Sequence, residues 1–199
     1  METEQIVFCQ GFGMLRHKTK STAHPCYTSF VQHRGSIPLY WGQDSSNIIP
    51  KPPIHLSMVD PYFSSAALHF DNILKRYGSP IIVLNLVKKK ERTKRESILL
   101  EEYTNCVTYL NQFLKPEKKI QYIAFDMARA AKSDDEDVIQ VLEAVASKVL
   151  EKVGFYHSPG HSYFNLYAEE KERDRFQMGI VRTNCIDCLD RVIYLNNSD

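Results

Sequence analysis

Residues 79–87 read SPIIVLNLV, a nearly continuous run of apolar residues, several of them β-branched. Such a run is typical of a strand that is covered on both faces of a sheet. Just before it, residues 63–77 place apolar side chains at spacings of three and four, and Gly78 follows as a helix stop. This stretch therefore predicts an amphipathic helix followed by a fully buried strand.

The chain beyond this strand repeats the alternation of helix and strand. Residues 120–125 restore a strand pattern, and residues 134–153 predict a further helix with an acidic first turn. In the first 60 residues, many turn formers surround one β-prone run at 27–32. A helix is predicted between the strands at 79–87 and 120–125, ending before Pro116. Its apolar stripe is Leu99, Tyr103, Cys106, Leu110 and Phe113. We expect an α/β fold with a central mixed, largely parallel sheet flanked by helices.

Composition and charge exclude several classes of protein. Of 199 residues, 43% are hydrophobic, as in an ordinary globular protein. The 25 Lys and Arg against 24 Asp and Glu give a formal charge of +1, so the net charge does not favour binding to nucleic acid. No apolar run approaches the roughly 20 residues that span a bilayer, and residues 1–4 do not resemble a signal peptide. Five cysteines without a secretory signal predict reduced thiols. We expect a cytoplasmic protein that does not bind nucleic acid.

The segment with the clearest chemistry is residues 185–191, which have the form C-x5-R and follow an apolar run at 176–181. A strand that delivers Cys185 into a tight loop lets backbone N–H groups bind an anion and lower the thiol pKa. The planar fork of Arg191 can bind two phosphate oxygens. Asp187 is the expected acid, because Asp190 adjoins Arg191 and is more readily held ionised. The loop thus suits cleavage of a phosphate ester through a cysteinyl-phosphate, with further substrate contacts expected from Asn184, Ile186, Cys188, Leu189 and Asp190.

Three other readings of the cysteines remain open. Cys185 can be a buried structural thiol. Cys185 and Cys188 have C-x2-C spacing, and His157 and His161 could complete a zinc site, although this order is unusual for a zinc finger. A redox dithiol is the third reading, but the redox C-x-x-C normally opens a helix near the first strand of its fold. The thiol mechanism itself requires no metal or other cofactor.

Two blocks of the sequence resemble the Sac family of phosphoinositide phosphatases. Residues 182–191, RTNCIDCLDR, match the pattern of its signature loop over ten consecutive residues, and residues 30–41, FVQHRGSIPLYW, resemble its Q-x-R-G-S-x-P-x-x-W block. The short stretches ETEQI, HFD and NLV also occur in the family order. Residues 51–54, 79–89 and 108–114 are most similar to the branch that removes the 5-phosphate from phosphatidylinositol 3,5-bisphosphate.

The resemblance carries further implications for activity and partners. It implies a phosphoinositide phosphatase whose nucleophile is Cys185, whose phosphate ligand is Arg191 and whose acid is Asp187. The implied substrate is a phosphoinositide lipid on a membrane surface, and the implied partners are a scaffold protein and a lipid kinase. It places the protein peripherally on endosomal or vacuolar membranes. Some family members respond to magnesium, so an effect of magnesium stays open.

The chain departs from the family pattern after the loop, where Val192 and Ile193 stand in place of Thr-Asn. Residues 1–199 therefore resemble a partial Sac catalytic domain, with the N-terminal flank and the helix after the loop missing, as in a gene-model fragment or a splice product. Too few residues follow Arg191 for a stable isolated helix, so we expect this chain alone to have a mobile loop, a Cys185 pKa nearer that of an ordinary thiol and much less activity than its full-length parent. The alternative function is an inactive or weakly active phosphate-binding or scaffold module.

Three features outside the loop have two interpretations each. Residues 88–96 hold six basic and two acidic residues, which suits either an anionic membrane or a solvated loop. Asp126 follows a predicted strand, where it can bind a ligand or cap a helix. Arg34, Gly35 and Ser36 either form a simple turn or support the catalytic core.

Overall fold

The computed structural model describes residues 2–9, 26–43, 52–91, 94–126, 138–158, 175–184 and 186, with the main chain alone for 2–9 and Cys26. Its elements, in chain order, are β1 (Glu2–Cys9), β2 (Cys26–Gly35), β3 (Trp41–Gln43), β4 (Ile54–Leu56), α1 (Ser64–Tyr77), β5 (Ile81–Asn85), α2 (Glu96–Leu110), a 3-10 turn at Pro116–Lys118, β6 (Gln121–Ala124), α4 (Val138–Val153), β7 (Tyr156–Ser158) and β8 (Ile180–Asn184).

The main sheet is mixed, with a parallel centre. Its strand order is β1-β2-β8-β5-β6, and β7 pairs with β2. The pairs β2–β8, β8–β5 and β5–β6 are parallel, whereas β1 and β7 run antiparallel to β2. Strands β3 and β4 form a separate two-stranded hairpin. The predicted α/β class is confirmed, while the C-x5-R loop lies outside the described residues apart from Ile186.

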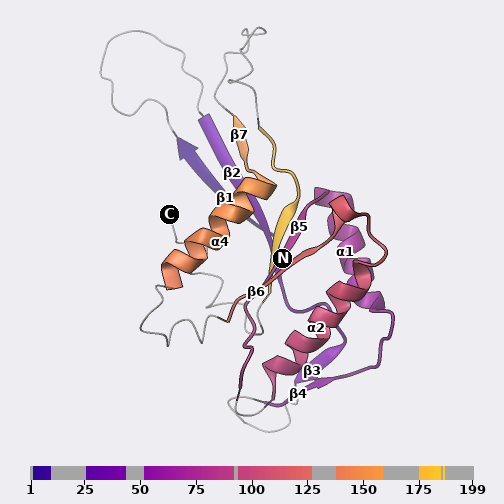
Figure 1. The fold of residues 1–199 in the computed structure, drawn as a ribbon. Coiled ribbons are helices and arrows are strands. Elements are labelled where there is room, and N and C mark those ends of the chain that lie inside the picture. The colour runs from indigo at the N-terminus through magenta and orange to yellow at the C-terminus, as the bar shows by residue number, and fades with distance from the viewer. Residues whose placement is uncertain are drawn as a thin grey trace, which may run out of the picture.

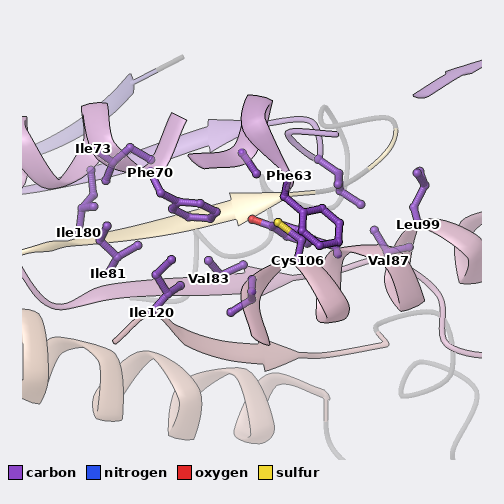
Figure 2. Packing of buried hydrophobic residues seen from close by; sticks show 14 of the residues in the cluster. Phe63, Phe70, Ile73, Ile81, Val83, Val87, Leu99, Cys106, Ile120 and Ile180 are labelled. Carbon is purple, nitrogen blue, oxygen red and sulfur yellow. The ribbon is translucent and has the colours of Figure 1, made fainter. Parts of the chain in front are cut away.

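Helices cover both faces of this sheet, as the buried run at 79–87 predicted. All five residues of β5 are buried. Successive side chains of a strand point to opposite faces, so Ile81 and Val83 pack under α1 and α2, whereas Ile82 and Leu84 belong to the cluster that includes Val149 of α4. Figure 1 shows α1 and α2 on one side of the sheet and α4 on the other. Figure 2 shows from close by the cluster that contains Ile81 and Val83.

The two helices around β5 end for different local reasons. Helix α1 ends at Tyr77, and Gly78, with φ +73°, donates its N–H to the carbonyl of Leu74, as the sequence predicted. Helix α2 ends at Leu110, because the Asn111 side chain bonds both the N–H and the C=O of Ile120, at 2.8 and 2.9 Å. Phe113 lies beyond this end and is 71% exposed. Its assignment to the buried stripe of the helix was wrong.

The first 60 residues contain more strand than their many turn formers indicated. Strand β1 pairs with β2 from Glu2 opposite His33 to Cys9 opposite Cys26, and β3 and β4 add a hairpin. The β-prone run at 27–32 is confirmed as part of β2. Helix α4 occupies 138–153 of the predicted 134–153, and residues 134–137 lie outside the described part. Among the described helices, none is both long and apolar enough to cross a bilayer.

Candidate active site

Strand β8 leads directly to the proposed nucleophile. Its five residues, Ile180–Asn184, are all buried, and Cys185 is the next residue in the chain. The prediction that a strand precedes Cys185 is therefore confirmed. Ile186 is half-buried and packs against the core under α1 and α2. The other predicted loop residues lie outside the described part of the chain, so their roles stay predictions: Cys185, Asp187, Cys188, Leu189, Asp190 and Arg191.

The fold brings the two Sac-like blocks of the sequence together. Strands β2 and β8 are parallel neighbours, with Arg34 opposite Thr183 and Gly35 opposite Asn184. Arg34 and Gly35 belong to a strand, so their reading as a simple turn was wrong. Residues 34 and 35 thus flank the strand that leads into the signature loop, which agrees with a role in supporting the catalytic core.

Polar side chains from α1 and three neighbouring strands form a continuous hydrogen-bonded chain. Arg182 donates from Nε to His69 Nε2 at 2.8 Å and from Nη1 to Asn184 Oδ1 at 3.3 Å. Asn184 donates to Asn85 Oδ1 at 2.5 Å, and Asn85 donates to the Tyr122 hydroxyl at 2.5 Å. Because an unpaired buried polar group is costly, this chain favours one orientation of each side chain. It links α1, β8, β5 and β6 immediately before Cys185.

His69 enters this chain as a neutral acceptor. Its Nε2 accepts the Arg182 hydrogen bond, so that nitrogen carries no proton. Burial, and then the positive charge of Arg182 and the neighbouring His33, lower the pKa of His69 to about 4. The His33 and His69 rings meet edge to face at 5.3 Å between centroids. Near neutral pH, Arg182 is therefore the charged member of this group.

The lowered pKa of His69 predicts a loss of stability in mild acid. The folded-state pKa of His69 lies below the ordinary value of 6.5, so between these two values the unfolded chain binds a proton more readily than the folded chain does. The stabilisation is present above about pH 6.5 and is lost as the pH falls toward about 4. His69→Gln keeps a neutral acceptor for Arg182 and removes the titration. We expect its melting temperature to fall less than that of the wild type between pH 7.5 and 5, and equal slopes would show that His69 does not contribute.

The basic segment at 88–96 leaves the sheet at the same edge. It follows β5, and the Leu86 N–H donates to the carbonyl of Asn184 at 3.0 Å. The Lys89 N–H donates to Asp126 Oδ2 at 2.8 Å, which joins the loops after β5 and β6. Lys88 Nζ lies 3.8 Å from Glu96 Oε1, whereas the Lys89 side chain is exposed. Asp126 thus lies at the predicted edge, and its binding of a ligand stays a prediction.

The cysteine and histidine alternatives are only partly within the described residues. Cys106 is buried in the core, and burial raises the pKa of its thiol to about 12, so it is unreactive near neutral pH. His157 lies on β7 with Nδ1 3.0 Å from Thr28 Oγ1. His161, like the C-x2-C cysteines, lies outside the described part. Within the described residues, no three metal-ligating side chains cluster together.

A separate groove of about 380 Å³ lies between α1 and the end of α2. Its lining is mostly apolar and includes Phe70, Leu74 and Phe113. Its one carboxylate, Asp71, lies 2.6 Å from the Lys75 ammonium group. The groove also touches Ile120, which precedes β6, so it lies toward the amino ends of the strands. None of the described residues that line it is a cation, which makes this lining a poor match for a phosphate group.

Comparison with known proteins identifies the family of this chain. The family model described as the SacI homology domain matches residues 1–132. The chain belongs to the SacI homology domain family, in agreement with the resemblance seen in the two sequence blocks.

The relatives match most of the chain. It is 50% identical over 191 residues to the polyphosphoinositide phosphatase of Schizosaccharomyces pombe, covering 96% of this chain and 22% of that protein. It is 34% identical over 245 residues to phosphatidylinositol-3-phosphatase SAC1 of Arabidopsis thaliana, covering 96% and 26%. Phosphoinositide phosphatase SAC4 of Arabidopsis thaliana is 35% identical over 205 residues, covering 82% and 25%. The chain thus spans about a quarter of the length of these relatives.

Sequence reasoning had assigned no roles to Arg182, His69, Asn85 and Tyr122. A signal was nevertheless present for three of them. His69 belongs to the HFD stretch, Asn85 is the single polar residue between Pro80 and Lys88, and Arg182 opens the signature string. Tyr122 carried no comparable signal, because aromatic residues are ordinary in strands.

Proposed function

We propose that this chain forms part of the active site of a phosphoinositide phosphatase that removes the 5-phosphate of phosphatidylinositol 3,5-bisphosphate. The observation that carries the proposal is strand β8, which ends at Asn184 and leads directly into the C-x5-R segment at 185–191. In α/β sheets, ligands bind beyond the carboxyl ends of the strands. The relatives are named as phosphoinositide phosphatases, which supports the same class of reaction.

The proposed reaction runs in two steps. The thiolate Sγ of Cys185 attacks phosphorus, the bond from phosphorus to the inositol oxygen breaks, and Asp187 donates its proton to that oxygen. Arg191 binds two of the phosphate oxygens as negative charge develops on them. Water then attacks the cysteinyl-phosphate, with the Asp187 carboxylate accepting its proton, and the sulfur leaves as thiolate. Inorganic phosphate is released and the enzyme is restored.

The position of the phosphate is proposed from the detailed sequence. Residues 51–54, 79–89 and 108–114 resemble the 5-phosphatase branch, and the relative with 50% identity is named a polyphosphoinositide phosphatase. Another relative, with 34% identity, is named a 3-phosphatase. The 3-position is therefore the alternative that an assay must distinguish.

A membrane-bound substrate also suits the basic segment at the carboxyl edge. Lys89, Lys90 and Lys94 are exposed, and the described structure gives their ammonium groups no ion pair. A basic residue near an anionic leaflet contributes about 1 kcal/mol. We infer that this segment faces the lipid surface, with the solvated loop as the alternative. The family resemblance supports an endosomal or vacuolar membrane, and a scaffold protein and lipid kinase as partners.

The assay presents the intact protein with a panel of phosphoinositides in vesicles and measures both released phosphate and the remaining lipid. We expect release from phosphatidylinositol 3,5-bisphosphate, with the 3-phosphate left on the product. Release from the 3-position alone would contradict the branch assignment. Release from no phosphoinositide would contradict the proposed function.

The thiol mechanism needs no resident metal, so turnover is expected to survive EDTA. Vesicle charge changes when magnesium is removed, and a parallel assay with a soluble inositol phosphate controls for that effect. Complete loss of turnover in EDTA with restoration by zinc would favour the metal alternative that uses Cys185 and Cys188. Partial stimulation by magnesium is compatible with the proposal.

A second function is favoured by one sequence observation. Val192 and Ile193 stand where the family has Thr-Asn after the loop arginine. A loop with an altered exit can bind phosphate without turning it over, as a scaffold or pseudo-phosphatase would. Titration of inositol phosphates alongside the assay separates the two, because saturable binding with no phosphate release supports this second function.

A further inference from the structure

Arg182 is a buried cation whose contacts with the described residues are all neutral. Its side chain is 1% exposed. Besides the bonds to His69 and Asn184, Nη2 donates to the carbonyl of Ser36 at 2.5 Å, and the guanidinium carbon lies 5.9 Å from the centroid of the Tyr103 ring. Among the described residues, no carboxylate forms an ion pair with it. Burying such a charge is unfavourable unless an anion compensates it.

The same arginine holds the end of β8 in place. Its Nη1 fixes the Asn184 side chain from one side, and Asn85 fixes it from the other. Its Nη2 reaches Ser36, directly after β2. The residue that follows Asn184 is Cys185. Arg182 therefore ties the end of β8, from which the signature loop departs, to the end of β2 directly and to β5 through Asn184.

We propose that Arg182 is a positioning residue for the phosphatase reaction, one that fixes the entry to the signature loop and whose buried charge favours the Cys185 thiolate and the substrate phosphate. The inference rests on the proposed function. It differs from the role of Arg191, because Arg182 is held by protein groups and is not proposed to contact substrate. Because His69 is neutral, Arg182 is the one positively charged side chain in this hydrogen-bonded chain.

The test measures the thiol pKa of Cys185 from the rate of its alkylation by iodoacetamide against pH, in the intact protein, with each cysteine peptide quantified by mass spectrometry. Cys106 does not interfere, because its pKa of about 12 keeps it protonated. Arg182→Met removes the charge and keeps a long side chain. Arg182→Lys keeps the charge and loses the planar fork.

We expect Arg182→Met to raise the Cys185 pKa by about one unit or more, because Arg182 bonds to Asn184, the residue before Cys185, and loss of a nearby positive charge disfavours a thiolate. Arg182→Lys should keep the Cys185 pKa near that of the wild type, while kcat falls because the strand end is less firmly held. Thr183→Val is the matched control on the same strand. The Thr183 hydroxyl is buried without a hydrogen-bond partner in the described structure, so its removal should leave the Cys185 pKa unchanged.

An Arg182→Met protein with lower thermal stability and an unchanged Cys185 pKa would overturn the inference and leave a purely structural role. If Arg182→Met does not fold, Arg182→Lys provides the test. A Cys185 pKa raised to that of a free thiol in this variant, despite the retained charge, would also overturn the inference. Failure of the proposed function is a distinct result, namely no phosphate release by the wild-type protein from any phosphoinositide.

Discussion

Replacing Cys185 by serine is expected to lower phosphate release by about a thousand-fold or more, because removal of an enzyme's nucleophile has effects of that size. A serine hydroxyl ionises far less readily than a thiol, so the field of the loop cannot convert it to an attacking anion. The exchange of sulfur for oxygen changes little else. Binding of inositol phosphates should therefore persist. Phosphate release from vesicles at saturating substrate is the measurement.

Cys106→Ala is the control for this substitution. Cys106 is fully buried between the helices and the sheet, so its truncation should lower the melting temperature. It is not part of the proposed loop, so turnover per folded molecule should not change. Activity that survives Cys185→Ser would place the nucleophile elsewhere and would end the thiol mechanism.

Gly179→Ala is expected to give the largest loss of stability. Gly179 has φ +88°, and a Cβ at this position would lie 2.6 Å from the backbone nitrogen of Pro80 and closer still to its carbonyl oxygen. The neighbouring N–H of Ile180 donates to that same carbonyl, where the chain enters β8 beside β5. Backbone cannot give way as a flexible side chain can, so we expect a cost of about 4 kcal/mol or more.

A loss of that size is a large part of the roughly 5–15 kcal/mol that stabilises an ordinary domain. Gly154→Ala is the matched control, because Gly154 has φ +69° and its added Cβ would be 3.8 Å from the carbonyl of Phe176, an ordinary contact. It should cost only the conformational term of about 1–2 kcal/mol. Urea unfolding of both variants tests this, and similar midpoints would show that close packing at Gly179 is unimportant.

The central strand β5 and the helix before it could be predicted, because the spacing of apolar residues in each indicates which side chains are buried. The run at 79–87 contains β5, and the spacing of apolar residues at 63–77 contains α1. An amide residue that ends a helix through a tertiary contact leaves a weaker signal. Asn111 ends α2 by bonding Ile120, nine residues later, and no periodicity before it indicates this.

Edge strands were harder to predict, because pairing rather than local pattern defines them. Strand β1 gains its hydrogen bonds from β2, with Glu2 opposite His33. Strand β7 pairs with β2 as well, with Tyr27 opposite Ser158. Neither partner is near in sequence, and an edge strand need not be a continuous apolar run.

The candidate site was likewise predictable only where a local pattern in the sequence indicated it. The strand before Cys185 could be expected from the apolar run that precedes the loop. The burial of Arg182 could not, because an arginine is normally exposed and its partner His69 lies 113 residues away in the sequence. Its environment is set by the packing of α1 and α2 on the sheet, which a sequence pattern does not record.

The central claim is that Cys185, at the end of β8, is the nucleophile that attacks phosphorus. The most direct measurement is to quench the intact protein during turnover of a labelled phosphoinositide at a series of times and to locate the label by mass spectrometry. The account predicts phosphate bound to Sγ of Cys185, with an amount that follows turnover. Phosphate on a different residue, or turnover with no phosphate on Cys185 at any quench time, would contradict the claim.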